Sequence, residues 1–157
     1  MALRTIRLES DTILRKKAKK VERVDGAILT LLRDMADTMY KHDGVGLAGN
    51  QVGVLKRVLV ADDGDGLVML VNPVIVEKEG NECKEEGCLS VPEIYGEVER
   101  ASYIKVKALD EKGKKIELKA YDFLARILQH EIDHLDGRLF TDIASNIGRR
   151  NTEEKSE

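Results

Sequence analysis

The segment 129–134 reads Gln-His-Glu-Ile-Asp-His, and it constrains this chain more strongly than any other segment. On a helix, His130 and His134 lie four residues apart, so both imidazole rings project from one face and can bind one ion. Glu131 follows the first histidine and can reach a water molecule on that ion. The chain must therefore fold so that at least one further ligand reaches this face of the helix.

The residues that follow this segment do not supply that ligand. They match the metzincin protease pattern His-Glu-x-x-His-x-x-Gly-x-x as far as Leu139. Phe140 stands where that pattern has its third histidine. The third ligand has to come from another part of the chain.

Cys88 is the candidate for this ligand. As a thiolate beside two neutral imidazoles it would give a Cys/His/His site with an open fourth position, which is typical of a catalytic metal. We expect His42 at an exposed helix end and Cys83 in a solvated connection, so both are weaker alternatives. Because a free cysteine is more often inert than a ligand, the residues alone leave the assignment open.

The composition indicates one globular domain with a heavily charged surface. Apolar residues make up 42% and charged residues 35% of the chain. The formal net charge is −3, so the protein has no overall positive potential that would favour binding to DNA. For the basic run 15–20 a solvated helix face is favoured over contact with ribosomal RNA. We expect a single catalytic domain at 1–144 and a charged, flexible tail at 145–157.

Location can also be predicted. The N-terminus has no apolar run of signal-peptide length, and the sequence has no apolar stretch long enough to span a membrane. Two cysteines in this composition do not indicate a secreted disulfide scaffold. We therefore expect a cytoplasmic protein without a membrane partner.

The apolar spacing predicts the order of the elements. A short basic helix begins after Asp11 as its N-cap, and a second helix covers 26–41. A glycine-rich loop at 44–53 follows, and the metal-binding helix covers 121–135. Strands are predicted at 57–62, 67–77, 96–100, 103–110 and 115–120. This order predicts an α+β fold, with antiparallel-rich sheets around a central metal-binding helix and with N-terminal helices.

Three segments together resemble the signature motifs of the peptide deformylase family. They are Gly-Val-Gly-Leu-Ala-Gly-Asn-Gln at 44–51, Glu-Gly-Cys-Leu-Ser at 86–90 and Gln-His-Glu-Ile-Asp-His at 129–134. The resemblance implies that Cys88, His130 and His134 bind one divalent metal. Ferrous iron is the metal it favours, with zinc, nickel or cobalt able to occupy the site.

The resemblance also implies a reaction. The formyl group would be removed from the N-terminal formyl-methionine of new polypeptides, releasing formate, with Glu131 as general base and acid. The side-chain amide of Gln51 and the backbone N–H of Leu89 would donate to the formyl oxygen. The expected partners are N-formylmethionyl peptides and nascent chains, with ribosome association as a further expectation.

Substrate contacts are expected on both sides of the metal. Gly44 and Gly46 would let the backbone approach an extended peptide, which could pair as an added strand. Ile127 and Phe123 lie on the helix face of the two histidines and would form an apolar wall for methionine, with Val45 opposite. For Phe123, plain core packing is an equally good interpretation.

Two other activities are compatible with the same helix. A zinc endopeptidase would cleave internal peptide bonds, but the absent histidine at position 140 argues against it. A metal-binding module without catalysis would need neither Gln51 nor Glu131.

Overall fold

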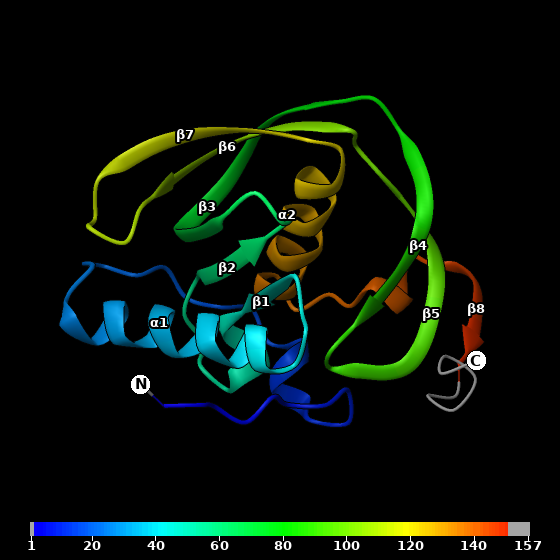
Figure 1. The fold of residues 1–157 in the computed structure, drawn as a ribbon, viewed down its shortest axis with the longest axis horizontal. Coiled ribbons are helices and arrows are strands. Elements are labelled where there is room, and N and C mark those ends of the chain that lie inside the picture. The colour runs from blue at the N-terminus through cyan, green and yellow to red at the C-terminus, as the bar shows by residue number, and fades with distance from the viewer. Residues whose placement is uncertain (1, 151–157) are drawn as a thin grey trace.

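An antiparallel five-stranded sheet forms the centre of the molecule in this computed structural model, which describes residues 2–150. Its strands, in spatial order, are β1 (Gly46–Ala48), β2 (Val58–Asp62), β3 (Leu67–Glu79), β6 (Tyr103–Leu109) and β7 (Lys115–Tyr121). A second antiparallel sheet has the order β4 (Glu82–Cys88), β5 (Val91–Arg100) and β8 (Ser145–Arg149). Figure 1 shows the helix α2 (Asp122–Leu135) between the two sheets.

Strand β2 of the larger sheet is covered on both of its faces. Leu59 and Ala61 pack in the core with α2, whereas Val58 and Val60 pack in the core with α1 (Gly26–Lys41). Successive side chains of a strand point to opposite faces, so a strand covered on both faces is apolar throughout. The uninterrupted apolar run of β2 thus follows from its place between two helices.

The N-terminal helices match their predicted starts. The Asp25 side chain caps α1 by accepting a hydrogen bond of 3.0 Å from the Ile28 N–H. Asp11 caps η1 (Thr12–Arg15) in the same way through Ile13. η1 is one turn of 3-10 helix, shorter than the basic helix that was expected. Two further 3-10 turns are η2 (Gly49–Val52) and η3 (Phe140–Asp142).

The α+β fold with antiparallel sheets around a central helix is confirmed. Two local predictions were wrong. The segment 44–53 is not one loop, because its residues form β1 and η2. The segment with Cys83 is strand β4 rather than a connection, although Cys83 is exposed there as expected.

The prediction of a flexible tail at 145–157 was also wrong for residues 145–149, which the structure describes as a strand. Ser145–Arg149 forms β8 and pairs with β5, because its backbone completes the edge of the second sheet. Residues 151–157 of the predicted tail lie outside the described residues. Within residues 2–150, no helix is long and apolar enough to cross a membrane.

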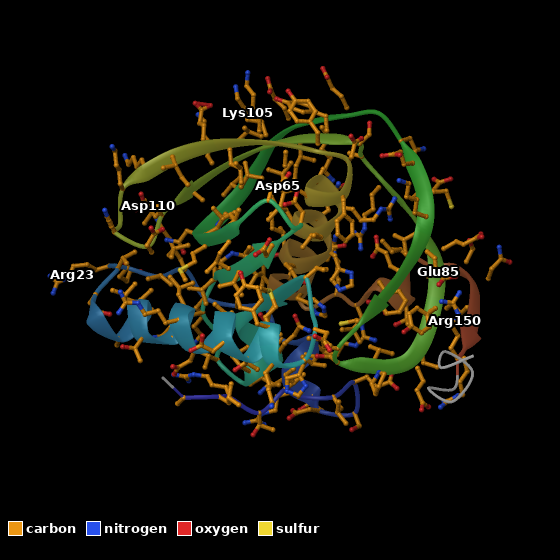
Figure 2. All side chains as sticks on the ribbon, viewed as in Figure 1. Arg23, Asp65, Glu85, Lys105, Asp110 and Arg150 are labelled. Carbon is orange, nitrogen blue, oxygen red and sulfur yellow. The ribbon has the colours of Figure 1, made fainter. Side chains whose placement is uncertain are left out.

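Charged side chains surround this framework, as the composition predicted. Arg23 projects outward in Figure 2, and Glu85 and Arg150, labelled in the same view, are exposed as well. Glu85 and Arg150 also form an ion pair of 2.6 Å that joins β4 to the end of β8.

Candidate metal centre and active site

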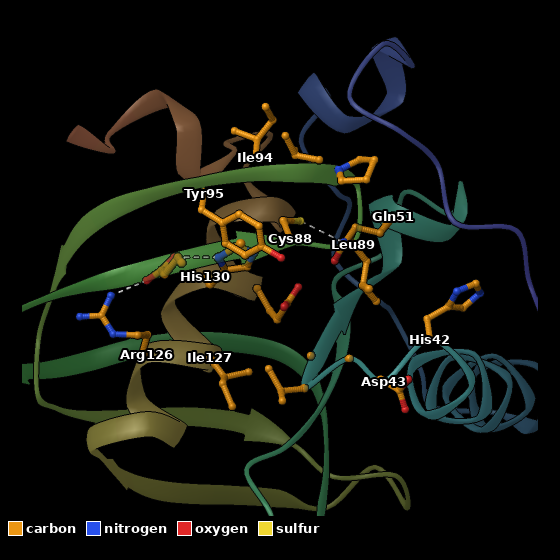
Figure 3. A pocket seen from close by; sticks show the side chains of 18 of the residues that line it. His42, Asp43, Gln51, Cys88, Leu89, Ile94, Tyr95, Arg126, Ile127 and His130 are labelled. Carbon is orange, nitrogen blue, oxygen red and sulfur yellow. Dashed lines mark hydrogen bonds and ion pairs between the residues drawn. The ribbon is translucent and has the colours of Figure 1, made fainter. Parts of the chain in front are cut away.

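The helix α2 and the end of strand β4 bring three potential metal ligands together. His130 and His134 lie on one face of α2, and their Nε2 atoms are 3.3 Å apart. Cys88 is the last residue of β4, and its Sγ atom lies 3.3 Å from His134 Nε2. The three ligand atoms all lie within 4.8 Å of one another. Figure 3 shows Cys88 and His130 facing each other across the site.

This donor set fits a divalent metal. Ligand atoms placed tetrahedrally about 2.0–2.3 Å from an ion are about 3.3–3.7 Å apart, which matches the two short separations. His134 is fully buried, and burial followed by the charge of His130 lowers its pKa well below 6.5. Its imidazole is therefore neutral and has a lone pair to offer. The three ligand atoms converge as the donors of a metal site do, and such ligands bind a metal in their deprotonated forms.

Glu131 lies beside this cluster and is buried. Its side-chain Oε1 has no hydrogen-bond partner among residues 2–150. Burial, together with the Glu86 carboxylate, raises its pKa to about 7, although the charge of His130 acts in the opposite direction. The carboxyl group is thus largely buried next to the proposed ligands.

Glu86 fixes the orientation of His130. Its Oε1 lies 2.9 Å from His130 Nδ1, so Nε2 is turned toward Cys88 and His134. Arg100 donates two hydrogen bonds to the same carboxylate, at 2.9 and 3.0 Å, and Arg126 also pairs with it. Burial acts to raise the pKa of Glu86, but these hydrogen bonds, from His130 first, hold it at about 2.

This ion-pair network was not predicted from the sequence. The sequence motifs assign no role to Glu86, Arg100 or Arg126, whereas Gln129 and Asp133 each directly precede a histidine of the pair and could be expected to orient it. Gln129 instead binds the backbone of Ala101 through both ends of its amide. Asp133 binds Arg100 at 2.6 Å and so reaches His130 only through Glu86. The available signal was strand alternation, because Glu86 precedes Cys88 by two residues on β4 and shares its face.

The side-chain amide of Gln51 lies at the other side of the cluster. Its Oε1 accepts a hydrogen bond of 3.0 Å from the Ala48 N–H, which fixes the end of the amide that carries oxygen. The NH₂ group therefore faces the cluster, 3.1 Å from Ser90 Oγ and 3.5 Å from Cys88 Sγ. Leu89, between Cys88 and Ser90, stands in the turn that joins β4 to β5.

A cavity of about 720 Å³ opens over these groups. It is lined by most of the residues predicted for the site, namely Gly44, Val45, Gly46, Gln51, Cys88, Leu89, Phe123, Ile127, His130 and Glu131. His134 is fully buried and does not belong to the lining. Val45 and Phe123 are partly exposed at the cavity, whereas Ile127, on α2, is buried.

His42 and Tyr95 line the same cavity. His42 ends α1 and is exposed, as expected, and it does not belong to the cluster of ligand atoms. The Arg150 guanidinium lies over the ring of Tyr95, a residue of β5. Its central carbon Cζ is 4.7 Å from the centre of that ring.

Comparison with known proteins places this geometry in a family. The family model described as polypeptide deformylase matches residues 3–150. Peptide deformylase 1 of Clostridium acetobutylicum is 56% identical over 142 residues, which is 90% of this chain and 95% of that protein. Peptide deformylase of Acetivibrio thermocellus is 58% identical over 142 residues, covering 90% of this chain and 84% of the relative.

Solved structures agree with the sequence relatives. The crystal structure of peptide deformylase from Thermotoga maritima matches with a TM-score of 0.90 at 44% sequence identity, covering 92% of this chain and 99% of that one. Both the fold and the sequence are therefore shared over nearly the whole length. This chain belongs to the polypeptide deformylase family and is an enzyme of that class.

Proposed function

We propose that this enzyme removes the formyl group from the N-terminal formyl-methionine of newly made polypeptides in the cytoplasm, using one divalent metal held by Cys88, His130 and His134. The observation that carries the proposal is the convergence of these three ligand atoms, within 4.8 Å, next to a buried glutamate in an open cavity. Imidazole and thiolate ligands suit several metals, and we propose Fe²⁺, with Zn²⁺, Ni²⁺ or Co²⁺ as substitutes. When bound, the metal would act as a Lewis acid and lower the pKa of a water molecule. The water could then lose a proton near neutral pH and act as the nucleophile.

Glu131 moves the proton in this proposal. It lies on α2 directly after a ligand, and its Oε1 is not engaged by any described residue. The carboxylate accepts a proton from the attacking water and later donates it to the amine nitrogen that leaves the formyl carbon. A base that returns its proton to the leaving group leaves the enzyme unchanged at the end of the cycle.

Gln51 and Leu89 stabilise the charge that develops on the formyl oxygen. The Gln51 amide is locked by Ala48, so its NH₂ group faces the reacting centre rather than its carbonyl oxygen. The Leu89 N–H would be the second donor. One such donor typically contributes about 10²–10³ in rate.

The peptide is proposed to bind along β1. This strand is an edge of the five-stranded sheet and pairs with β2 on its other side, so an extended peptide can add to it. Gly44 and Gly46 keep the approach open, and Val45, Ile127 and Phe123 form the apolar surface for the methionine side chain. Association with the ribosome would bring nascent chains to this edge.

The test measures formate release and metal content in the same preparations. Protein loaded anaerobically with Fe²⁺ should release formate from formyl-Met-Ala-Ser. Glu131→Ala should abolish turnover and retain the metal, whereas Cys88→Ala should lose both. Cys83→Ala is the matched control, because Cys83 is exposed on β4 and away from the cluster. Full activity in Glu131→Ala, or full metal content in Cys88→Ala, would contradict these roles.

A further inference from the structure

The N-terminal segment 7–11 touches both connections that carry the proposed donors to the formyl oxygen, namely the 3-10 turn η2 with Gln51 and the β4–β5 loop with Leu89. The Arg7 N–H donates a hydrogen bond of 2.6 Å to the carbonyl oxygen of Gln51. The Glu9 N–H donates one of 2.8 Å to the carbonyl oxygen of Ser90, the residue after Leu89. A single short segment therefore bonds to two loops that are far apart in the sequence.

This segment is itself held in place. Arg7 and Asp11 form an ion pair of 2.9 Å, and the Asp11 N–H closes a turn by donating to Leu8 O at 2.8 Å. The Arg7 guanidinium lies over Gly53, where a Cβ would come within 2.8 Å of it. Upstream, Arg4 binds Asp34 of α1. The two N–H groups thus project from an anchored backbone.

The two loops also meet each other directly. Gln51 Nε2 donates to Ser90 Oγ at 3.1 Å, and the side chains of both residues are buried. The contacts Arg7–Gln51, Gln51–Ser90 and Ser90–Glu9 therefore form a closed ring. In such a ring, the distance between the loops depends on the N-terminal segment.

We propose that segment 7–11 is a clamp that positions the Gln51 amide and the Leu89 N–H for the transition state. This inference rests on the proposed roles of those two donors. Donors of this kind act only when they are already in place as charge develops, and small displacements lower the rate strongly. Arg7 and Glu9 act through their backbone N–H groups and are positioning residues, not catalytic ones.

Glu9→Pro tests the clamp, because proline lacks the N–H that binds Ser90. Glu9 follows Leu8 in the turn that Asp11 closes, and neither Glu9 nor Ser10 has a positive φ. Proline is favoured at the second position of such a turn, so the backbone can keep its shape. Glu9→Ala is the matched control, since it removes only an exposed side chain and keeps the N–H.

The clamp predicts a specific kinetic pattern. Glu9→Pro should lower kcat about tenfold, with KM and metal content within about twofold of the parent. Glu9→Ala should change kcat less than about twofold. In a Gln51→Ala background the effect of Glu9→Pro should be clearly smaller, because one of the two donors that the clamp positions is gone while the Leu89 N–H remains.

The other possible results separate failure of the clamp from failure of the proposed function. If Glu9→Pro has the kcat of Glu9→Ala, or keeps its full effect without Gln51, the clamp is overturned while the proposed function stands. If Gln51→Ala alone leaves kcat unchanged, the role of Gln51 fails and the clamp fails with it. Should Glu9→Pro not fold, Arg7→Pro compared with Arg7→Ala makes the same test at the hydrogen bond to Gln51.

Discussion

Gly46 and Glu131 lie against each other, so that a Cβ at position 46 would come within 2.5 Å of Glu131 Oε2 and within 2.8 Å of Ile127 Cγ2. The strand that is proposed to bind the peptide and the carboxylate that is proposed to move the proton are therefore packed without space for a methyl group. Gly46 is needed for this close approach, not for an unusual backbone angle.

Gly46→Ala should lower kcat/KM for formyl-Met-Ala-Ser by at least about tenfold, because Glu131 must move away from its position. Metal content should stay unchanged, since the atoms nearest to the added methyl group belong to Glu131 and Ile127 and not to a proposed ligand. Gly44→Ala is the comparison: its Cβ would meet the flexible end of the Leu89 side chain, at 2.7 Å, and a smaller loss is expected. Equal losses in the two variants would show that the contact with Glu131 is not decisive.

Glu86→Gln should destabilise the fold and weaken metal binding together. The substitution leaves the buried Arg100 and Arg126 without their shared carboxylate, a loss of about 3–5 kcal/mol for a buried pair. It also loosens His130, and loss of such an orienting group typically costs about 10–100-fold in metal affinity. Urea unfolding and a metal titration measure the two effects.

The control for this variant is the neighbouring residue Glu85→Gln. Glu85 is exposed and its ion pair with Arg150 is largely in solvent, so its loss should cost less than about 1 kcal/mol. If Glu85→Gln and Glu86→Gln unfolded at the same urea concentration, the buried network would not contribute as described.

Asp34 should make stability depend on pH. The Ala2 N–H and then the Arg4 guanidinium hold the pKa of its carboxyl below the ordinary value of 3.8. A carboxylate with a lowered pKa in the folded state contributes stability above its unfolded pKa and loses it as the pH falls through the folded value. The difference in urea midpoint between the parent and Asp34→Asn should be full near neutral pH and shrink below 3.8. A difference that is constant with pH would argue against this ion pair.

Gly137→Ala should destabilise the end of α2. Gly137 has φ of +77°, and a Cβ there would lie 2.6 Å from the carbonyl oxygen of Arg15. The left-handed conformation alone costs a residue with a side chain roughly 1–2 kcal/mol, and the contact adds to this. Gly148→Ala is the control, because its Cβ would meet no described atom within 4 Å. Urea unfolding of both variants should show a loss only for position 137.

The regular elements could be predicted because their side chains carry the pattern. The bounds of α1 match the predicted helix at 26–41, where Ile28, Leu31, Leu32, Met35 and Met39 recur on one face and are buried. The strands β6 and β7 show a similar match. In these segments burial on one face repeats at the period of the element, so a single sequence is enough.

The short strands could not be predicted in this way. β1 has three residues and lies in a glycine-rich segment, and it becomes a strand because β2 lies beside it. β8 contains Ile147 as its apolar residue and is held by backbone hydrogen bonds to β5. Backbone pairing leaves no periodic side-chain signal, so the sequence reads as a polar tail.

The candidate site shows the same division. His130, Glu131 and His134 follow from helical spacing, and Cys88 follows from the combination of motifs. The network of Glu86, Arg100 and Arg126 joins β4, β5 and α2, so its burial depends on how three distant segments meet. The N-terminal contacts to Gln51 and Ser90 depend on backbone atoms, which every residue except proline offers equally.

Strand β8 gives the second sheet its last edge, and this has a consequence for how the protein is made. Until residues 145–149 have been synthesised, β5 has unpaired N–H and C=O groups beside Ile94 and Tyr95, which line the cavity. An open strand edge of this kind readily pairs with other chains. Truncation before residue 145 should therefore favour aggregation during expression, an effect on folding that is separate from any effect on catalysis.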